Sequence, residues 1–166
     1  MKTEVRSTVP THCMANTYSQ IYLQIVFAVK NREALIQKEW KGRLHAYITG
    51  IVQRNGHKML SINSMPDHIH LFIGYKPTHL ISDLVEEINT SSNRFVKENK
   101  FSKRPFAWQK GYGAFSYSRS QLPVVAKYIE NQESNHAKKT FREEFLEMLR
   151  KFELEFDEKY LFDFFE

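Results

Sequence analysis

The sequence predicts an α+β fold in which an antiparallel sheet is covered by helices on one face, with further helices at the C-terminal end. Three observations support this prediction. Alternating apolar residues mark four strands, apolar residues spaced by three and four mark helices, and Gly, Pro and Asn residues separate these segments. The 166 residues are enough for about one domain with its own core.

The first half of the chain predicts one strand, one helix and a strand pair. Residues 18–29 alternate and are rich in β-branched and aromatic residues, which predicts the first strand. Residues 38–55 have apolar residues at helical spacing and end at an Asn-Gly pair, a common helix stop. Residues 58–64 and 68–75 predict two strands, and the Pro66-Asp67 pair between them predicts a hairpin.

The second half predicts another helix, a fourth strand and two further helices. Residues 81–99 have a helical pattern, and residues 113–118 predict a short strand. A third helix is expected from Ser120 to about Asn135, and a fourth covers about 140–156. The order strand, helix, strand, strand, helix, strand is that of the split βαβ, or ferredoxin-like, fold.

Charge is distributed unevenly along this chain. Residues 141–166 hold nine acidic and four basic residues, a net charge of −5, which leaves +10 for residues 1–140. A basic body suits a phosphate-backbone partner, although many basic proteins bind no nucleic acid.

We divide the chain into a disordered leader (1–15), a main domain (16–140) and an acidic helical tail packed on that domain (141–166).

Cysteine content and hydropathy indicate the compartment. The single cysteine, Cys13, cannot form an intramolecular disulfide, and the first 15 residues lack the apolar core of a secretory signal. The chain has no run of about 18 apolar residues, so no membrane span is expected. The sequence therefore predicts a cytoplasmic protein.

Two histidines one residue apart, His68 and His70, lie in the strand predicted for residues 68–75. Side chains two apart in a strand point to the same face, so these imidazoles would lie side by side. Such a pair offers two ligands to one metal ion and leaves positions open for substrate. The alternative is a pair of solvated histidines at a sheet edge.

Basic and aromatic residues interleave between Lys97 and Arg119. Cations can follow a phosphate backbone while rings stack on unpaired bases, which is typical of a single-strand groove. Some of these rings, Trp108 among them, could instead be core residues. The candidate DNA-binding residues are Lys97, Lys100, Lys103, Arg104, Trp108, Lys110, Tyr112 and Arg119.

The third predicted helix has a polar set beside its apolar face. Tyr128 and Gln132 are four residues apart and so share one face, and His136 follows one turn later. Taken alone, an exposed Tyr and Gln on a helix are most simply solvated residues. The remaining candidates are single histidines in turns or on helix faces, and we interpret them as surface residues: His45, His57 and His79.

Three motifs together resemble a known family. They are Pro66-Asp67-His68-Ile69-His70-Leu71, the run from Trp108 to Ser116, and Lys127-Tyr128-Ile129-Glu130-Asn131-Gln132 with Asn135-His136 after it. In this order and spacing they resemble the single-tyrosine HUH transposases of the insertion-sequence-200-like family, where HUH denotes histidine, hydrophobic residue, histidine. The resemblance extends from Tyr18 to about Phe145.

The resemblance implies a mechanism and a set of roles. Tyr128 would be the nucleophile that forms a 5′-phosphotyrosine, and His68, His70 and Gln132 would hold the metal ion, with His136 as an accessory residue. Mg²⁺ is the metal that the family implies, and Mn²⁺ suits two imidazoles at least as well. The implied substrate is single-stranded DNA with hairpins at the ends of an insertion sequence. The implied assembly is a homodimer in which Tyr128 of one subunit serves the histidines of the other.

Three functions remain open from the sequence. The first is an active transposase. The second is a domesticated relative that processes chromosomal hairpin repeats. The third is a nucleic-acid-binding module without enzymatic activity, and the presence of all four implied site residues disfavours it.

Overall fold

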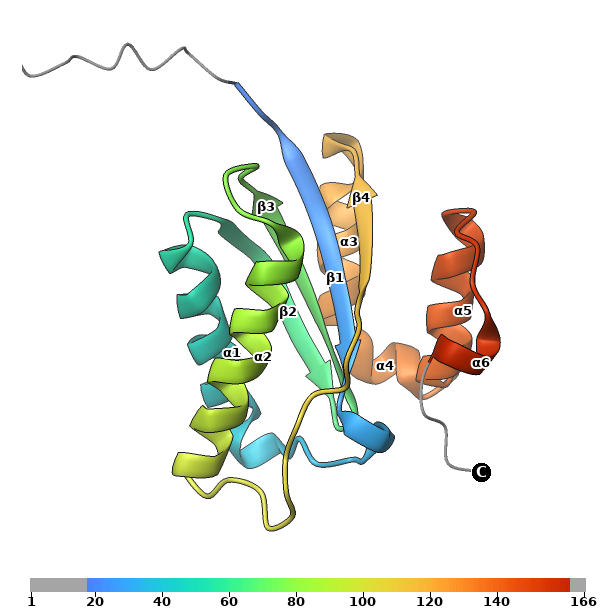
Figure 1. Ribbon diagram of the computed structural model, residues 1–166. Coiled ribbons are helices and arrows are strands. Elements are labelled where there is room, and N and C mark those ends of the chain that lie inside the picture. The colour runs from blue at the N-terminus through green and yellow to red at the C-terminus, as the bar shows by residue number, and fades with distance from the viewer. Residues whose placement is uncertain (1–17, 162–166) are drawn as a thin grey trace, which may run out of the picture.

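A four-stranded antiparallel sheet forms the centre of the protein (Figure 1). The computed structural model describes residues 18–161, so the predicted leader lies outside the described residues. The strands are β1 (Ile21–Ala28), β2 (Lys58–Met65), β3 (His68–Tyr75) and β4 (Gly113–Tyr117). They are arranged in the order β2-β3-β1-β4, which confirms the predicted ferredoxin-like sheet.

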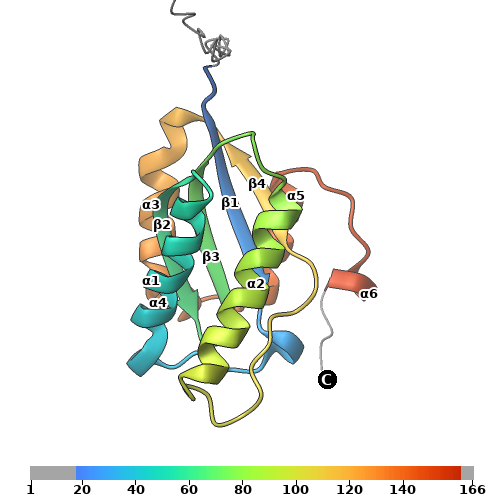
Figure 2. The same cartoon turned by 60° about the vertical axis from the view of Figure 1, so that its left-hand side comes forward.

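Helices α1 (Lys38–Arg54) and α2 (Ile81–Glu98) cover one face of the sheet (Figures 1 and 2). Alternation along the two central strands supplies the apolar side chains beneath them. These side chains are buried and belong to one cluster with the helices: Leu23, Ile25 and Phe27 of β1, and Ile69, Leu71 and Ile73 of β3. This layer forms the main hydrophobic core.

The C-terminal helices lie on the opposite face. Helix α3 (Leu122–Glu130) packs on Phe72 through Val125 and Ile129. The short α4 (Gln132–His136) follows, and then α5 (Phe141–Lys151) and α6 (Glu158–Leu161). A second cluster joins α5 to the sheet through Val26, Ala28, Phe115, Phe141, Phe145, Met148 and Leu149. The segment predicted as an acidic tail therefore places an apolar stripe against β1 and β4.

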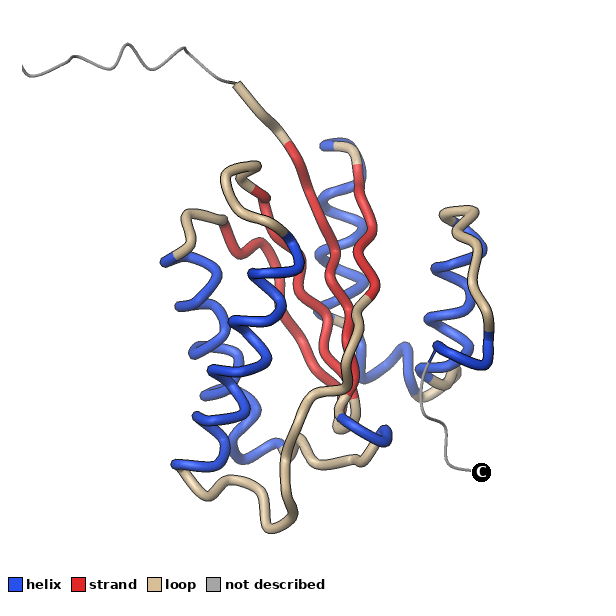
Figure 3. The backbone as a smooth tube through the Cα atoms, viewed as in Figure 1, coloured by secondary structure: helices blue, strands red, loops and turns tan. Residues whose placement is uncertain are grey.

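The prediction of one helix to Asn135 is wrong, because α3 ends at Glu130 and α4 begins at Gln132 (Figure 3). The side-chain amide of Asn63 donates to the carbonyls of Ile129 at 2.9 Å and of Glu130 at 3.1 Å. This contact takes carbonyl groups that would otherwise accept within the helix, so the chain turns at Asn131.

Helix α5 also ends earlier than predicted, at Lys151 rather than near residue 156. Glu153 has a φ of 51°, in the left-handed region, and the amide of Leu154 donates to the carbonyl of Leu149 at 3.0 Å. This is a helix C-terminal turn of the Schellman type formed without glycine.

His57 is buried at 4% exposure, so its prediction as a surface residue is wrong. Its ring stacks on Tyr75, and its Nδ1 accepts from the backbone amide of Lys76 at 3.0 Å.

Within the described residues, no helix is both long and apolar enough to span a membrane.

Candidate metal and nucleophile site

His68 and His70 lie on an internal strand and point to the face that carries α3, α4 and α5. Their register partners on β1 are Ala28 and Val26. Both imidazoles are buried, at 1% and 0% exposure, and their ring centroids are 5.1 Å apart. The two rings are therefore side by side as predicted, and a solvated sheet edge is excluded.

His68 is oriented by a carboxylate behind it. Its Nδ1 lies 2.7 Å from Oδ1 of Asp67, and Arg32 donates to Oδ2 of the same group at 2.6 Å. Burial alone would raise the pKa of Asp67, but hydrogen bonds with His68 and Arg32 lower it to about 2. An ionised carboxylate can only accept, so Nδ1 of His68 carries the proton. Burial lowers the pKa of His68 to about 4, which leaves Nε2 with its lone pair at neutral pH.

His70 is oriented by an amide instead. Nε2 of the Gln24 amide donates to Nδ1 of His70 at 2.9 Å, and the hydroxyl of Tyr117 donates to Oε1 of the same amide at 2.9 Å. Gln24 itself is 1% exposed. The contact occupies Nδ1 and turns Nε2 of His70 towards the space beneath α4 and α5, where it has no hydrogen-bond partner.

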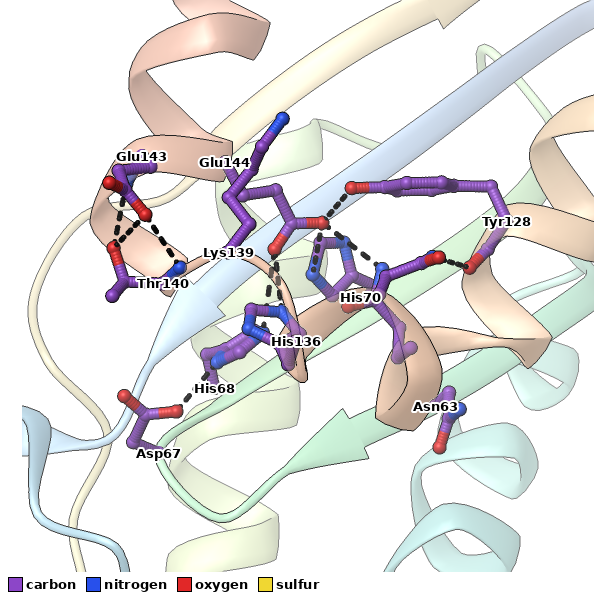
Figure 4. A network of polar contacts seen from close by, with 12 residues as sticks. Asn63, Asp67, His68, His70, Tyr128, His136, Lys139, Thr140, Glu143 and Glu144 are labelled. Carbon is purple, nitrogen blue, oxygen red and sulfur yellow. Dashed lines mark hydrogen bonds and ion pairs between the residues drawn. The ribbon is translucent and has the colours of Figure 1, made fainter.

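Tyr128 and Gln132 both reach this space and contact one carboxylate, that of Glu144. Figure 4 shows Tyr128 and Glu144 beside His70. The hydroxyl of Tyr128 donates to Oε1 of Glu144, and Nε2 of Gln132 donates to the same oxygen at 3.1 Å. That oxygen lies 3.6 Å from Nε2 of His70. A single chain thus brings the predicted nucleophile next to its own histidines.

Glu144 was not predicted as a site residue, because it lies in the segment predicted as an acidic helical tail packed on the domain (141–166). The side chain is 3% exposed, and a capping box of Thr140 and Glu143 starts the helix just before it. A signal was present, because residues 141, 144, 145 and 148 follow the spacing of a buried helix face and Glu144 occupies one of these positions.

Five buried polar atoms in this space lack hydrogen bonds: Nε2 of His68, His70 and His136, Oε1 of Gln132, and Oε2 of Glu144. Ligand atoms of the three histidines and Glu144 all lie within 4.8 Å of one another. Unpartnered buried polar atoms are costly unless a further group satisfies them. Imidazole and carboxylate are ligands of first-row divalent metals, so this donor set fits a metal ion.

The phenol of Tyr128 stays protonated in this arrangement. Burial and the adjacent Glu144 carboxylate raise the pKa of Tyr128 well above its ordinary value. Tyr128 as a whole is 37% exposed and lines a cavity of about 230 Å³ between α3 and α5.

Comparison with known proteins identifies the family. Residues 17–132 match the model of the family described as "Transposase IS200 like". The chain belongs to the IS200-like transposases. The match ends at Gln132, so His136 and Glu144 lie beyond it.

Individual relatives agree with this assignment. The chain is 26% identical over 118 residues to the ISDra2 transposase TnpA of Deinococcus radiodurans, covering 68% of this chain and 84% of that protein. A crystal structure of a transposase from D. radiodurans R1 aligns with a TM-score of 0.58 and 25% identity, over 71% of this chain and 95% of that one. The REP-associated tyrosine transposase has a similar fold, with a TM-score of 0.56, 13% identity and coverage of 74% and 72%.

The structure of this IS200-like transposase separates the predicted DNA-binding residues. Four of them line one cavity of about 660 Å³ at the end of α2 and in the loop after it: Lys97, Lys100, Lys103 and Arg104. Lys110 and Tyr112 are exposed in the same long connection to β4, whereas Arg119 follows the other end of β4.

Trp108 is 5% exposed and belongs to the main core, so its prediction as a base-stacking residue is wrong. Its indole nitrogen donates to Oγ of Ser92 at 2.7 Å, and its ring contacts Phe27 edge-to-face. The indole N–H therefore has its hydrogen-bond partner within the protein. The buried ring has no free face on which a DNA base could stack.

Proposed function

We propose that the protein cleaves and rejoins single-stranded DNA through an intermediate in which Tyr128 carries the 5′-phosphate of the cut strand. The observation that carries this proposal is the hydrogen bond from Tyr128 to Glu144, because the same carboxylate faces His68, His70 and His136. A nucleophile next to a candidate metal site is the arrangement that phosphoryl transfer requires.

The chemistry follows from these groups. The phenol of Tyr128 loses its proton and its oxygen forms a bond to phosphorus, while the bond from phosphorus to the 3′ oxygen breaks. The leaving 3′ oxygen takes up one proton, which balances the proton lost by the phenol, and departs as a 3′-hydroxyl. The phosphotyrosine keeps a phosphodiester, and a second 3′-hydroxyl can therefore reverse the step without a nucleotide cofactor.

The residues proposed to hold a metal are His68 and His70, oriented from behind by Asp67 and Gln24, with Gln132 on α4 beside them. A bound Mg²⁺ or Mn²⁺ would polarise a phosphate oxygen and lower the cost of forming the phenolate. Until substrate arrives, the Glu144 carboxylate holds the Tyr128 hydroxyl within the site.

The proposed substrate is single-stranded DNA with a hairpin. The REP-associated tyrosine transposase was solved bound to a REP hairpin. In the present chain the cavity lined by Lys97, Lys100, Lys103 and Arg104 supports a phosphate-backbone contact. A homodimer remains a prediction, and a shared active site is not required, since Tyr128 reaches the histidines of its own chain through Glu144.

The test uses a hairpin oligonucleotide with single-stranded flanks, incubated with the full chain and Mn²⁺ and run on a denaturing gel. We expect a covalent protein–DNA adduct that falls by at least about 1,000-fold in Tyr128→Phe. Tyr160→Phe is the matched control, because Tyr160 is 77% exposed on α6. An adduct of normal yield from Tyr128→Phe would exclude Tyr128 as the nucleophile.

A further inference from the structure

Glu144 occupies the centre of the site although it comes from a helix beyond the family match. Its Oε1 accepts hydrogen bonds from Tyr128 and Gln132. Its buried Oε2 lies 3.8 Å from Nε2 of His68 and 2.8 Å from Nε2 of His136 (Figure 4). We propose that Glu144 is a ligand of the divalent metal, together with His68, His70 and His136. The inference rests on the proposed function in one respect, namely that this cluster is the metal site.

The distances support a shared ion. Divalent first-row metals bind imidazole nitrogen and carboxylate oxygen at about 2.0–2.2 Å, so two ligand atoms of one ion lie up to about 4.4 Å apart. The Glu144 oxygens lie 3.8 Å from Nε2 of His68, 3.6 Å from Nε2 of His70 and 2.8 Å from Nε2 of His136. All three separations fall within this limit.

The short contact between His136 and Glu144 has the geometry of two ligands. Nε2 of His136 and Oε2 of Glu144 are 2.8 Å apart, the separation of a close ion pair. Two ligand atoms bound to one ion at about 2.1 Å and at right angles lie about 3.0 Å apart, so this separation also suits a shared metal. His136 is the last residue of α4, which begins directly after the turn at Asn131. The position of this turn therefore brings His136 next to Glu144.

Gln132 also holds the Glu144 carboxylate within this site. Its Nε2 donates to Oε1 of Glu144, so the amide holds the carboxylate in place and leaves Oε2 towards His68 and His136. Phe141 supports the same position, because its ring stacks on His68 with centroids 3.9 Å apart and lies one turn before Glu144 on α5. Gln132 thus positions the carboxylate through Nε2, while its buried Oε1 has no hydrogen-bond partner and can serve the metal as proposed above.

The ligand set predicts which ion binds. Three imidazoles and one carboxylate suit Mn²⁺ better than Mg²⁺, which prefers oxygen ligands and retains several waters. The carboxylate also ties the metal to the nucleophile, because its other oxygen holds the hydroxyl of Tyr128. A change at Glu144 should therefore affect metal affinity in the absence of DNA.

The test measures Mn²⁺ binding to the full chain without DNA, from the loss of the free Mn²⁺ electron paramagnetic resonance signal. We expect Glu144→Gln to weaken Mn²⁺ binding at least about 10-fold. Glu147→Gln is the matched control, because Glu147 lies on the same helix, has a side chain that is 58% exposed and pairs with Lys139. It should stay within about two-fold of the parent.

Two further variants keep the test decisive. His136→Gln should weaken Mn²⁺ binding at least several-fold, and Glu144→Asp should fall between the parent and Glu144→Gln, because it keeps a shorter carboxylate. Circular dichroism at each titration temperature checks that every variant is folded. Parent-like Mn²⁺ affinity in folded Glu144→Gln, or a parent that binds no Mn²⁺, would overturn the inference.

Adduct formation with hairpin DNA is scored separately. Weak Mn²⁺ binding by Glu144→Gln, with no adduct from the parent, would support the ligand assignment and reject the proposed function. Unchanged Mn²⁺ binding by Glu144→Gln, with normal adduct formation by the parent, would reject the ligand assignment and leave the proposed function standing.

Discussion

The two faces of one sheet differ in what they bury. Towards α1 and α2, β1 and β3 present aliphatic and aromatic side chains, and the cluster formed there is the main core. Towards α3, α4 and α5, the same two strands present Gln24, His68 and His70, all at or below 1% exposure. Since neighbouring residues of a strand point to opposite faces, one strand can supply a core and a site at once.

The side chains of the site are held in place although apolar groups do not surround them completely. Each histidine has a partner behind it, Asp67 for His68 and Gln24 for His70, so the rings are fixed before any ligand arrives. Smaller apolar clusters flank the polar groups, with Phe72 under α3 and Phe115 under α5. The five unpartnered atoms of the site all face the space beneath α4 and α5.

The largest test of this division substitutes two neighbours on β3. Leu71 and His70 are both fully buried, on opposite faces. Leu71→Ala should lower the free energy of unfolding by about 3 kcal/mol, because it leaves a cavity in the main core. The folded variant should keep Mn²⁺ affinity within about three-fold. His70→Ala should instead lower Mn²⁺ affinity by at least about 100-fold, because it removes a ligand.

Chemical denaturation and Mn²⁺ titration of both variants check this pair. The division between the faces would be broken by a Leu71→Ala variant that loses metal binding while folded. It would equally be broken by a His70→Ala variant that binds Mn²⁺ like the parent.

The sequence predicted the sheet, the order of strands and helices along the chain, and the side-by-side histidines. These features depend on the local periodicity of apolar residues. The strand at residues 68–75 and the helix starts at Lys38 and Ile81 were predicted at their observed bounds. The alternation of a strand and the single apolar stripe of a helix can both be recognised within a short stretch of sequence. Tyr128 and Gln132 were identified through the family resemblance, and the structure brings both to Glu144.

Features set by contacts between distant segments were missed. The break at Asn131 depends on Asn63, and the burial of Glu144 depends on α5 packing over β1 and β4. Trp108 was assigned to DNA because basic residues surround it in the sequence, whereas its ring packs on Phe27 and bonds to Ser92. An acidic run is usually solvated, and only the spacing of residues 141, 144, 145 and 148 indicates otherwise.

Acid should destabilise both faces of the sheet, but only the face that carries the site should respond to Mn²⁺ as well. Burial lowers the pKa of His68 to about 4 on the site face, and burial with Lys41 lowers the pKa of His45 to about 4 on α1. A folded pKa below the unfolded value of 6.5 means that the unfolded chain binds the proton first. Stability is therefore complete well above pH 6.5, and we expect the metal-free protein to lose about 2 kcal/mol for each of these two histidines between pH 7 and pH 4.5.

Urea denaturation across this pH range separates the two contributions. His45→Gln should remove the share from α1 and leave the share from His68. Saturating Mn²⁺ should steepen the remaining pH dependence in His45→Gln, because protonation of a ligand competes with metal. A stability that stays constant from pH 7 to pH 4.5 in the metal-free parent would contradict the expectation.

The smallest expected effect concerns the attachment of α5 to the site face. A Cβ on Gly113 would lie 2.7 Å from the ring of Phe145 and 2.8 Å from that of Phe115, closer than real Cβ contacts. Gly113→Ala should therefore displace Phe145 and cost about 1 kcal/mol of stability. Because Glu144 precedes Phe145 on α5, the displacement should also weaken Mn²⁺ binding, by about three-fold, while leaving the core under α1 and α2 unchanged. Gly42→Ala is the matched control, since a Cβ there meets nothing within 4 Å. If Gly113→Ala lowered stability and left Mn²⁺ affinity at the parent value, the site would not depend on the position of α5, and the two faces would differ in composition but not in how their helices are held.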